Sequence, residues 1–210
     1  MHLFDTATVL AYLAAATVLV LLPGPGTAWI VAQTIAGGTA RGVRAGFGLE
    51  TATLIHALAA GLGLSAVLAT SALAFQAIKY AGAAYLVWLG IKAWREHGVE
   101  TVPETVSATV RNVYWRSVLT GVLNPKVAVF FLAFLPQFVH PGRGLVWLQF
   151  LVLGVLLSLI GMSHSTAIAF VVGRFGRRVS ASARFARWRQ RAIGGLFVGL
   201  GLRLALQQRG

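Results

Sequence analysis

Long apolar runs with few charged residues alternate with shorter polar gaps along the chain. The runs lie at about 6–33, 43–70, 73–94, 116–138, 146–172 and 192–207. A helix needs roughly 20 apolar residues to cross the hydrocarbon core of a bilayer. The runs are continuous and lack the alternation of a membrane β-barrel, so helices are left as the structure that satisfies their backbone groups in lipid. The pattern predicts an all-α integral membrane protein with six transmembrane helices.

The composition supports a lipid environment. Hydrophobic residues occupy 57% of the 210 positions and charged residues only 11%, against roughly 25% charged residues in a soluble domain. The formal charge of +13 raises the question of nucleic-acid binding. The cations, however, lie in the gaps between apolar runs instead of forming a stripe on one folded face. We therefore expect a lipid bilayer around the chain and no nucleic-acid partner.

The Lys and Arg residues are unevenly divided between alternate gaps. Thirteen of the 18 fall in the gaps after the first, third and fifth runs, at Arg41, Arg44, Lys92, Arg95, Arg111, Arg116, Arg174, Arg177, Arg178, Arg184, Arg187, Arg189 and Arg191. The positive-inside rule places such gaps on the cytoplasmic side of the membrane. Both the N-terminus and the C-terminus are then predicted to lie outside.

A more polar stretch at 96–114 divides the chain into two parts with three predicted helices each. We interpret this stretch as a cytoplasmic linker between a first repeat at 1–95 and a second repeat at 115–210, within one membrane domain. Because each part has an odd number of spans, the second part is inverted relative to the first. Helices 1 and 4 both carry an internal proline motif, at Pro23 and Pro125. The predicted architecture is a 3+3 inverted repeat with broken helices 1 and 4, an arrangement found in many transporters.

The motif Leu22-Pro23-Gly24-Pro25-Gly26 lies inside the first run. Two prolines remove two backbone donors and two glycines add conformational freedom, so a regular helix cannot continue. Lipid does not tolerate unwound backbone, so the break must face protein or a wet cavity. Its freed carbonyl and amide groups can bind the charged groups of a zwitterion. A purely structural kink is the alternative to this substrate-binding interpretation.

The motif Asn124-Pro125-Lys126 begins near the middle of the fourth run. At 1.5 Å per residue, Lys126 lies about 15 Å deep, near the bilayer midplane. A cation at that depth is costly and by default marks a functional site. Lys126 can attract a substrate carboxylate or pair with Glu50, and snorkelling to the surface is the structural alternative. We take Asn124, Pro125 and Lys126 as candidate substrate-binding residues.

Four further polar residues lie within predicted spans. Glu50 in the second run is a candidate proton carrier, and an interfacial ion pair with an arginine of the preceding gap is the alternative. His56 and His164 are candidate proton relays, although membrane histidines also simply bond a neighbouring helix. Gln137, at the outer end of the fourth run, is a candidate gate or helix cap.

Other residues are interpreted structurally. The glycines around the second run are expected to permit close helix packing. The aromatic residues near predicted helix ends are expected to form interfacial belts, and they are Tyr12, Trp29, Trp88, Trp94, Trp115 and Trp147. No carboxylate pair, metal-ligand spacing or phosphate-binding loop is evident, and the chain has no cysteine. We therefore expect no enzyme activity, no cofactor and no metal site.

Taken together, several motifs resemble the LysE/RhtB family of bacterial amino-acid exporters. The matching pieces are Leu22-Pro-Gly-Pro25, Gly42-Val-Arg-Ala-Gly46, Lys79-Tyr-Ala-Gly-Ala-Ala-Tyr85-Leu-Val-Trp-Leu-Gly90, Gly121-Val-Leu-Asn124-Pro-Lys126 and Phe130-Phe-Leu-Ala-Phe-Leu-Pro-Gln137. They follow one another through the first four predicted helices. The length and number of spans also fit the family.

The resemblance implies a secondary exporter of amino acids or their derivatives in the bacterial cytoplasmic membrane. It also implies coupling to protons and a central site lined by residues 23–25 and 124–126. Family members often carry Asn or Asp after the Pro-Gly-Pro, whereas Gly26 stands here and is followed by Thr27. Gly24, Pro25, Gly26 and Thr27 are therefore candidate substrate-binding residues together with Pro23. The alternatives are an exporter of another small solute or a metal cation, and a non-transporting membrane scaffold. The sequence is also compatible with a homo-oligomer.

Overall fold

The computed structural model describes residues 3–22, 24–70 and 110–175, with isolated positions between 73 and 91 and between 195 and 202. The regular elements in these described residues are all helices, which confirms the predicted fold class for this part of the chain. The predicted spans at 73–94 and 192–207 lie outside the described residues apart from those isolated positions. Most of the predicted linker also lies outside them.

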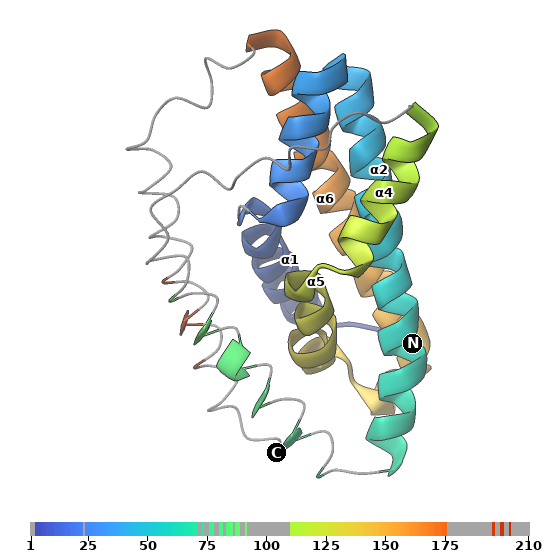
Figure 1. Ribbon diagram of the computed structural model, residues 1–210. Helices are drawn as coiled ribbons and strands as arrows, with labels where there is room; N and C mark the ends of the chain where they lie inside the picture. Colours follow the sequence, from blue (N-terminus) through green and yellow to red (C-terminus); the bar gives the residue numbers. More distant parts are fainter. Residues whose placement is uncertain are drawn as a thin grey trace.

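Figure 1 shows the helices packed side by side along one long direction. In chain order they are α1 (Thr6–Leu21), α2 (Pro25–Thr70), α4 (Val110–Val122), α5 (Pro125–Val129), the short helices η1 (Phe130–Phe134), η2 (Leu135–Phe138) and η3 (Pro141–Arg143), and α6 (Val146–Phe175). By length and composition, two described stretches, Pro25–Gly63 and Val146–Phe175, can cross a membrane. A third is formed if Asn112–Val122 and Pro125–Phe138, bent by 49°, count as one span.

α2 reverses direction at Gly37 and Gly38 instead of running straight. Gly38 has a φ of 77°, in the left-handed region that favours glycine. Across the turn, Arg41 Nε donates a hydrogen bond of 2.7 Å to Gln33 Oε1, although eight residues of straight helix would separate such residues by about 12 Å. The first limb of α2 (25–36) therefore follows α1, and the second limb (39–70) runs back beside it (Figure 1).

The second limb of α2 packs closely between α4 and α6. A Cβ added at Gly46 would lie only 2.9 Å from the Ser165 Cβ on α6, and one at Gly48 only 2.6 Å from the Ser117 Cβ on α4. Small residues let helix backbones approach to this distance and are a common basis of helix association in membranes. The predicted packing role therefore holds at these two glycines. The glycine at Gly63, in contrast, faces open space.

Two aromatic residues predicted for an interfacial belt are buried in the molecule instead. Tyr12 is fully buried and its hydroxyl donates a 2.6 Å hydrogen bond to the Leu153 carbonyl. Trp29 is 8% exposed, and its Nε1 donates a 2.7 Å hydrogen bond to Ser117 Oγ. Each ring has a polar atom that finds a partner inside the helix bundle, so burial is not costly. Trp115 is 64% exposed, as expected of an interfacial residue.

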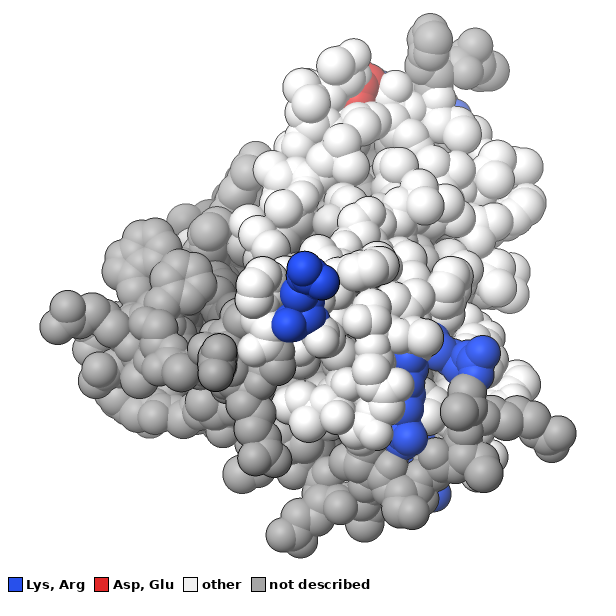
Figure 2. All heavy atoms as spheres, turned by 90° about the horizontal axis from the view of Figure 1, so that it is seen from above, with Lys and Arg blue, Asp and Glu red and all other residues white. Residues whose placement is uncertain are grey.

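The two ends of the bundle differ in their charges. The turn in α2, the start of α4 and the end of α6 lie together at the top of Figure 1, and these segments carry Arg41, Arg44, Arg116 and Arg174. Figure 2, seen from this end, shows a mostly uncharged surface with Lys and Arg side chains in separate places and a small Asp or Glu area near one edge. At the other end, Asp5 and Arg143 form an ion pair of 2.7 Å. Four described arginines therefore lie on segments at one end of the bundle.

Candidate functional site

A pocket lies where two helix interruptions meet. The first interruption is at residues 22–24, between α1 and α2, and the second is at residues 123 and 124, between α4 and α5. The middle of α2 and the middle of α6 complete the walls of the pocket, which has a volume of about 90 Å³. Since one water needs about 10–15 Å³ on this scale, the space accommodates several waters or a small solute.

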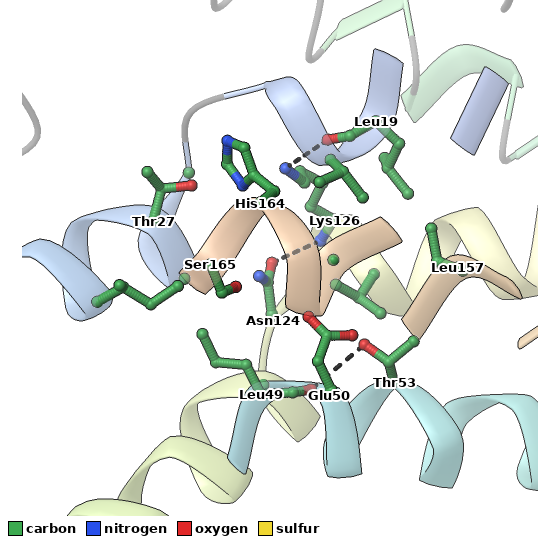
Figure 3. A pocket seen from close by; sticks show the side chains of 17 residues that line it. Leu19, Thr27, Leu49, Glu50, Thr53, Asn124, Lys126, Leu157, His164 and Ser165 are labelled. Carbon is green, nitrogen blue, oxygen red and sulfur yellow. Dashed lines mark hydrogen bonds between the residues drawn. The ribbon is translucent and has the colours of Figure 1, made fainter. Parts of the chain in front are cut away.

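The pocket brings together residues that sequence analysis selected from four separate segments. Those that line it are Gly24, Gly26, Thr27, Glu50, Asn124, Lys126 and His164. In Figure 3, Glu50 points into the pocket from α2, Thr27 and His164 lie on another side, and Lys126 reaches toward α1. A cation and a carboxylate on opposite walls give the pocket a polarity that suits a solute carrying both charges.

Lys126 links the second interruption to the end of α1. Its Nζ donates hydrogen bonds to the Leu22 carbonyl at 2.9 Å and the Leu19 carbonyl at 3.1 Å. The last carbonyls of a helix lack the usual partner four residues further on, and here the Leu19 carbonyl accepts a 3.3 Å bond from the Leu22 N–H in addition to the bond from Lys126. A cation near that end also interacts favourably with the helix dipole. Lys126 therefore acts as a C-terminal cap for α1, provided by a residue 104 positions further along the chain.

The second interruption has its own local cap. Asn124 is 7% exposed, and its Oδ1 accepts a 3.1 Å hydrogen bond from the Lys126 backbone N–H. Pro125 occupies the first turn of α5, where its missing N–H costs nothing and its fixed φ suits a helix start. Asn124 thus fixes the position of the Lys126 backbone, and this directs the lysine side chain across the pocket toward α1.

Glu50 occupies a space left for it by a glycine on α6. A Cβ added at Gly161 would overlap the Glu50 carboxylate. Ser158 and Thr53 lie within hydrogen-bonding reach of that carboxylate. A carboxylate inside a membrane helix bundle needs such polar neighbours, because removing it from water without partners is costly.

Two candidates, His56 and Gln137, are not among the residues that line the pocket. His56 Nε2 is 3.4 Å from the Gly121 carbonyl, and its ring stacks on Phe131 with centroids 6.0 Å apart. Gln137 Nε2 donates to the Phe134 carbonyl at 3.1 Å. Both side chains therefore contact backbone carbonyls, His56 one that lies on α4 and Gln137 one that lies three residues earlier in its own segment.

The prolines differ from the residues around them. Pro25 and Pro125 are exposed residues that begin α2 and α5 and are not among the pocket-lining residues. Pro23 lies outside the described residues. The prolines thus mark where helices begin, while the neighbouring glycines and polar residues line the space.

Four residues that were not predicted from the sequence lie on the pocket wall or next to Glu50, and they are Thr53, Ser158, Gly161 and Ser165. Thr53 follows Glu50 by three positions, and residues at this spacing share one face of a helix. Gly161 and Ser165 are four apart, the small-residue spacing typical of close helix contacts. The first spacing identifies a polar face of α2, but neither spacing says which helix faces Glu50.

Within the described part of the chain, no group of three or more His, Cys, Asp or Glu side chains is placed to hold a metal ion.

Comparison with known proteins gives consistent relatives over nearly the whole chain. The family described as LysE type translocator matches residues 17–208. An uncharacterized membrane protein of Vibrio cholerae is 40% identical over 200 residues, covering 93% of this chain and 95% of that protein. A homoserine/homoserine lactone efflux protein of Salmonella typhimurium is 34% identical, covering 93% and 94%. A leucine efflux protein of Enterobacter is 29% identical, covering 92% and 93%. No solved structure matches significantly.

Proposed function

The chain belongs to the LysE family of translocators, which are transporters and not enzymes, and on this basis we propose that it is a secondary active exporter of amino acids or their derivatives. The family resemblance found in the sequence is thereby confirmed. Relatives named for homoserine and leucine efflux support this substrate class. We further propose that the pocket between the two interruptions is the substrate site.

One observation carries this assignment: two interrupted helices from distant parts of the chain meet at a single pocket and are joined there by Lys126. Unwound backbone at membrane depth is tolerated where it lines a protein cavity, and transporters use such segments to bind substrates and ions. A structural kink would require neither a second interruption opposite it nor a lysine reaching across.

The chemistry of the walls suits an amino-acid zwitterion. Lys126 offers an ammonium group to a substrate carboxylate, and the carbonyl oxygens at the end of α1 offer acceptors to a substrate ammonium. Asn124, Gly26 and Thr27 border the same space. Aliphatic side chains complete the lining and suit an apolar substrate side chain, and they are Leu19, Val20, Ile30, Leu49, Val127 and Leu157.

We propose that export is coupled to protons and that Glu50 is the carrier. Glu50 lines the same pocket as the substrate groups, so its protonation state can change with the side of the membrane to which the pocket opens. His164 lines the pocket as well and is the second candidate. His56 is the weakest of the three because its ring faces Phe131 and the Gly121 carbonyl.

The finer architecture is part of the proposal. We infer a 3+3 inverted repeat with broken first and fourth spans in a bacterial cytoplasmic membrane, with both termini outside. Arg41, Arg44, Arg116 and Arg174 at one end of the bundle support a cytoplasmic location for that end. Rocking of one repeat against the other would expose the pocket to each side in turn. A homo-oligomer is compatible with this mechanism but not required by it.

Efflux from intact cells tests the assignment. Cells expressing the protein or carrying an empty vector are preloaded with labelled L-leucine or L-homoserine, with and without a protonophore. We expect faster efflux of at least one of them from expressing cells and loss of the difference with the protonophore. If no amino acid in a broader panel leaves faster despite confirmed membrane expression, the substrate class is wrong. Metal cations, other small solutes and a scaffold role would then be tested.

A further inference from the structure

The link between α1 and α5 is itself made of the groups that an amino acid would use. Lys126 Nζ donates to the carbonyl oxygens of Leu19 and Leu22 at 3.1 and 2.9 Å. These are a cation and two acceptors in direct contact at the edge of the pocket. A solute that binds them has to replace this contact.

There is space beside this contact. A Cβ added at Gly24 would lie 3.5 Å from Lys126 Nζ, an ordinary van der Waals distance. The absence of a side chain at Gly24 therefore leaves room for about one methyl group beside the ammonium, and Gly24 itself is buried and lines the pocket. Figure 3 shows Lys126 and Leu19 together at one wall of this space.

A carboxylate is a stronger acceptor for Lys126 than a neutral carbonyl, because hydrogen bonds between two charged groups are shorter and stronger. If a carboxylate took the ammonium, the Leu22 carbonyl would lose this donor and the Leu19 carbonyl would keep only the 3.3 Å hydrogen bond from the Leu22 N–H. Buried carbonyls that lose a donor are costly. An α-amino acid carries the needed donor on the adjacent carbon. Its ammonium can donate to the same carbonyls while its carboxylate binds Lys126, so every group keeps a partner.

We propose that an amino-acid zwitterion inserts between Lys126 and the end of α1 and thereby exchanges the internal link for two links through the substrate. This inference rests on the proposed function. It adds which chemical groups a solute needs in order to bind, and what binding does to the contact between α1 and α5. An amine without a carboxylate would place a second cation against the same carbonyls. An acid without an ammonium would replace neither of the two hydrogen bonds that these carbonyls accept from Lys126. Only a solute with both groups separates α1 from α5 without losing polar contacts.

The insertion also explains how binding can start the movement between the two halves. A ligand shifts a conformational equilibrium only through different affinities for the two states. Here the state with α1 in contact with Lys126 has no place for the zwitterion at that contact, and the separated state has one. The substrate therefore stabilises the separated state.

Binding measurements on the full-length protein purified in detergent test which chemical groups a solute needs. The probes are L-leucine, L-leucinamide, which lacks the carboxylate, and N-acetyl-L-leucine, which lacks the ammonium, with L-homoserine in parallel. We expect each of the two blocked compounds to bind at least about tenfold more weakly than L-leucine, the scale of one hydrogen bond to a charged group. Equal binding of L-leucinamide and L-leucine would overturn the proposal.

Gly24→Ala and Lys126→Arg give matched variants for the same assay. The added methyl group at Gly24 meets Lys126 at ordinary contact distance, so we expect a folded protein with weaker L-leucine binding. Lys126→Arg keeps a cation and is expected to retain the preference for L-leucine over L-leucinamide. Unchanged L-leucine affinity in folded Gly24→Ala would contradict the position assigned to the carboxylate.

A distance measurement tests the separation. The chain has no cysteine, and Leu21 and Leu123 are 49% and 70% exposed beside the two interruptions. Spin labels at Leu21→Cys and Leu123→Cys should report a changed distance distribution with L-leucine and none with L-leucinamide. The same change with both compounds would overturn the proposal while leaving the exporter assignment intact. If the wild type neither binds nor exports any amino acid tested, the proposed function fails and this inference fails with it.

Discussion

The interruption at residues 22–24 and the interruption at residues 123 and 124 are stabilised by different means. At the second, Asn124 caps the following helix from within the same segment, through its bond to the Lys126 N–H. At the first, the end of α1 receives its side-chain donor from Lys126, which is more than a hundred residues away. A locally capped helix end keeps its shape whatever its neighbours do. A helix end capped from a distant segment depends on the relative position of the two parts.

This difference indicates which interruption senses the substrate. The second interruption is a fixed support that positions Lys126. The cap at the first interruption is conditional, because in our proposal a substrate can replace the contact between Lys126 and the end of α1. Substitutions of four residues test this difference, from the largest expected effect to the smallest. They change the Lys126 cap of α1, the proposed proton carrier Glu50, and the local caps Asn124 and Asp5.

Replacing Lys126 removes the conditional cap. We expect Lys126→Met to abolish export and to lower the stability of the purified protein, since each lost hydrogen bond from a charged group contributes about 1.5–3 kcal/mol. Efflux of labelled L-leucine and thermal unfolding in detergent measure the two effects. Lys126→Arg, which keeps the charge, serves as the control and should recover most of the stability. Wild-type export by Lys126→Met would show that the link is dispensable.

Replacing Glu50 asks whether coupling and substrate binding are separable. Glu50→Gln preserves the shape that fits against Gly161 but cannot take up and release a proton. In proteoliposomes we expect Glu50→Gln to carry L-leucine down its own concentration gradient. A pH gradient should no longer accelerate this transport. His56→Gln is the matched control, because His56 lies outside the pocket, and it should keep the acceleration. An undiminished pH-gradient response in Glu50→Gln would exclude Glu50 as the carrier.

Replacing Asn124 removes the local cap and leaves Lys126 in the sequence. Loss of an N-cap costs about 1 kcal/mol, within a range of about 0.5–2. We expect Asn124→Ala to lower the unfolding midpoint moderately and to slow export without stopping it. Asn124→Ser, which restores a capping oxygen, should recover much of the loss. A complete loss of export from a stable Asn124→Ala protein would indicate that the amide contacts the substrate directly.

Asp5 provides a reference cap far from the pocket. Its Oδ1 accepts a 2.7 Å hydrogen bond from the Thr8 N–H, and its Oδ2 pairs with Arg143 at 2.7 Å. The Thr8 N–H first, and Arg143 after it, lower the pKa of Asp5 to about 2 from an ordinary 3.8. The stabilisation is therefore present above about pH 4 and is lost as the pH falls from 4 toward 2.

For Asp5→Asn we expect the smallest change, with export unaffected, because asparagine also caps helices well and the ion pair is 42% exposed on both sides. The unfolding midpoints of wild type and variant should differ slightly at pH 7 and converge below pH 4. A difference that grew on acidification would contradict the assigned ionisation.

The sequence predicts much of the helical framework and little of its assembly. Apolar runs and proline motifs locate helix ends, because proline removes a backbone donor wherever the chain later packs. The sequence allows Lys126 to pair with Glu50 but does not place the two residues around one pocket, since this depends on Gly161 making room on α6 and on the reversal of α2 at Gly38. Tyr12 was misjudged for a related reason: its position near a helix end says nothing about the Leu153 carbonyl that binds it inside the bundle.

The most direct test of the account asks whether an amino acid occupies the pocket between the two interruptions. In the cysteine-free chain, Thr27→Cys places a thiol on the pocket wall, and Leu145→Cys places one on an exposed loop at the far end of α6. With either L-leucine or L-homoserine, whichever the protein exports, we expect several-fold slower thiol modification of Thr27→Cys and an unchanged rate for Leu145→Cys. Equal modification rates with and without an amino acid that Thr27→Cys still exports would place the transport site elsewhere.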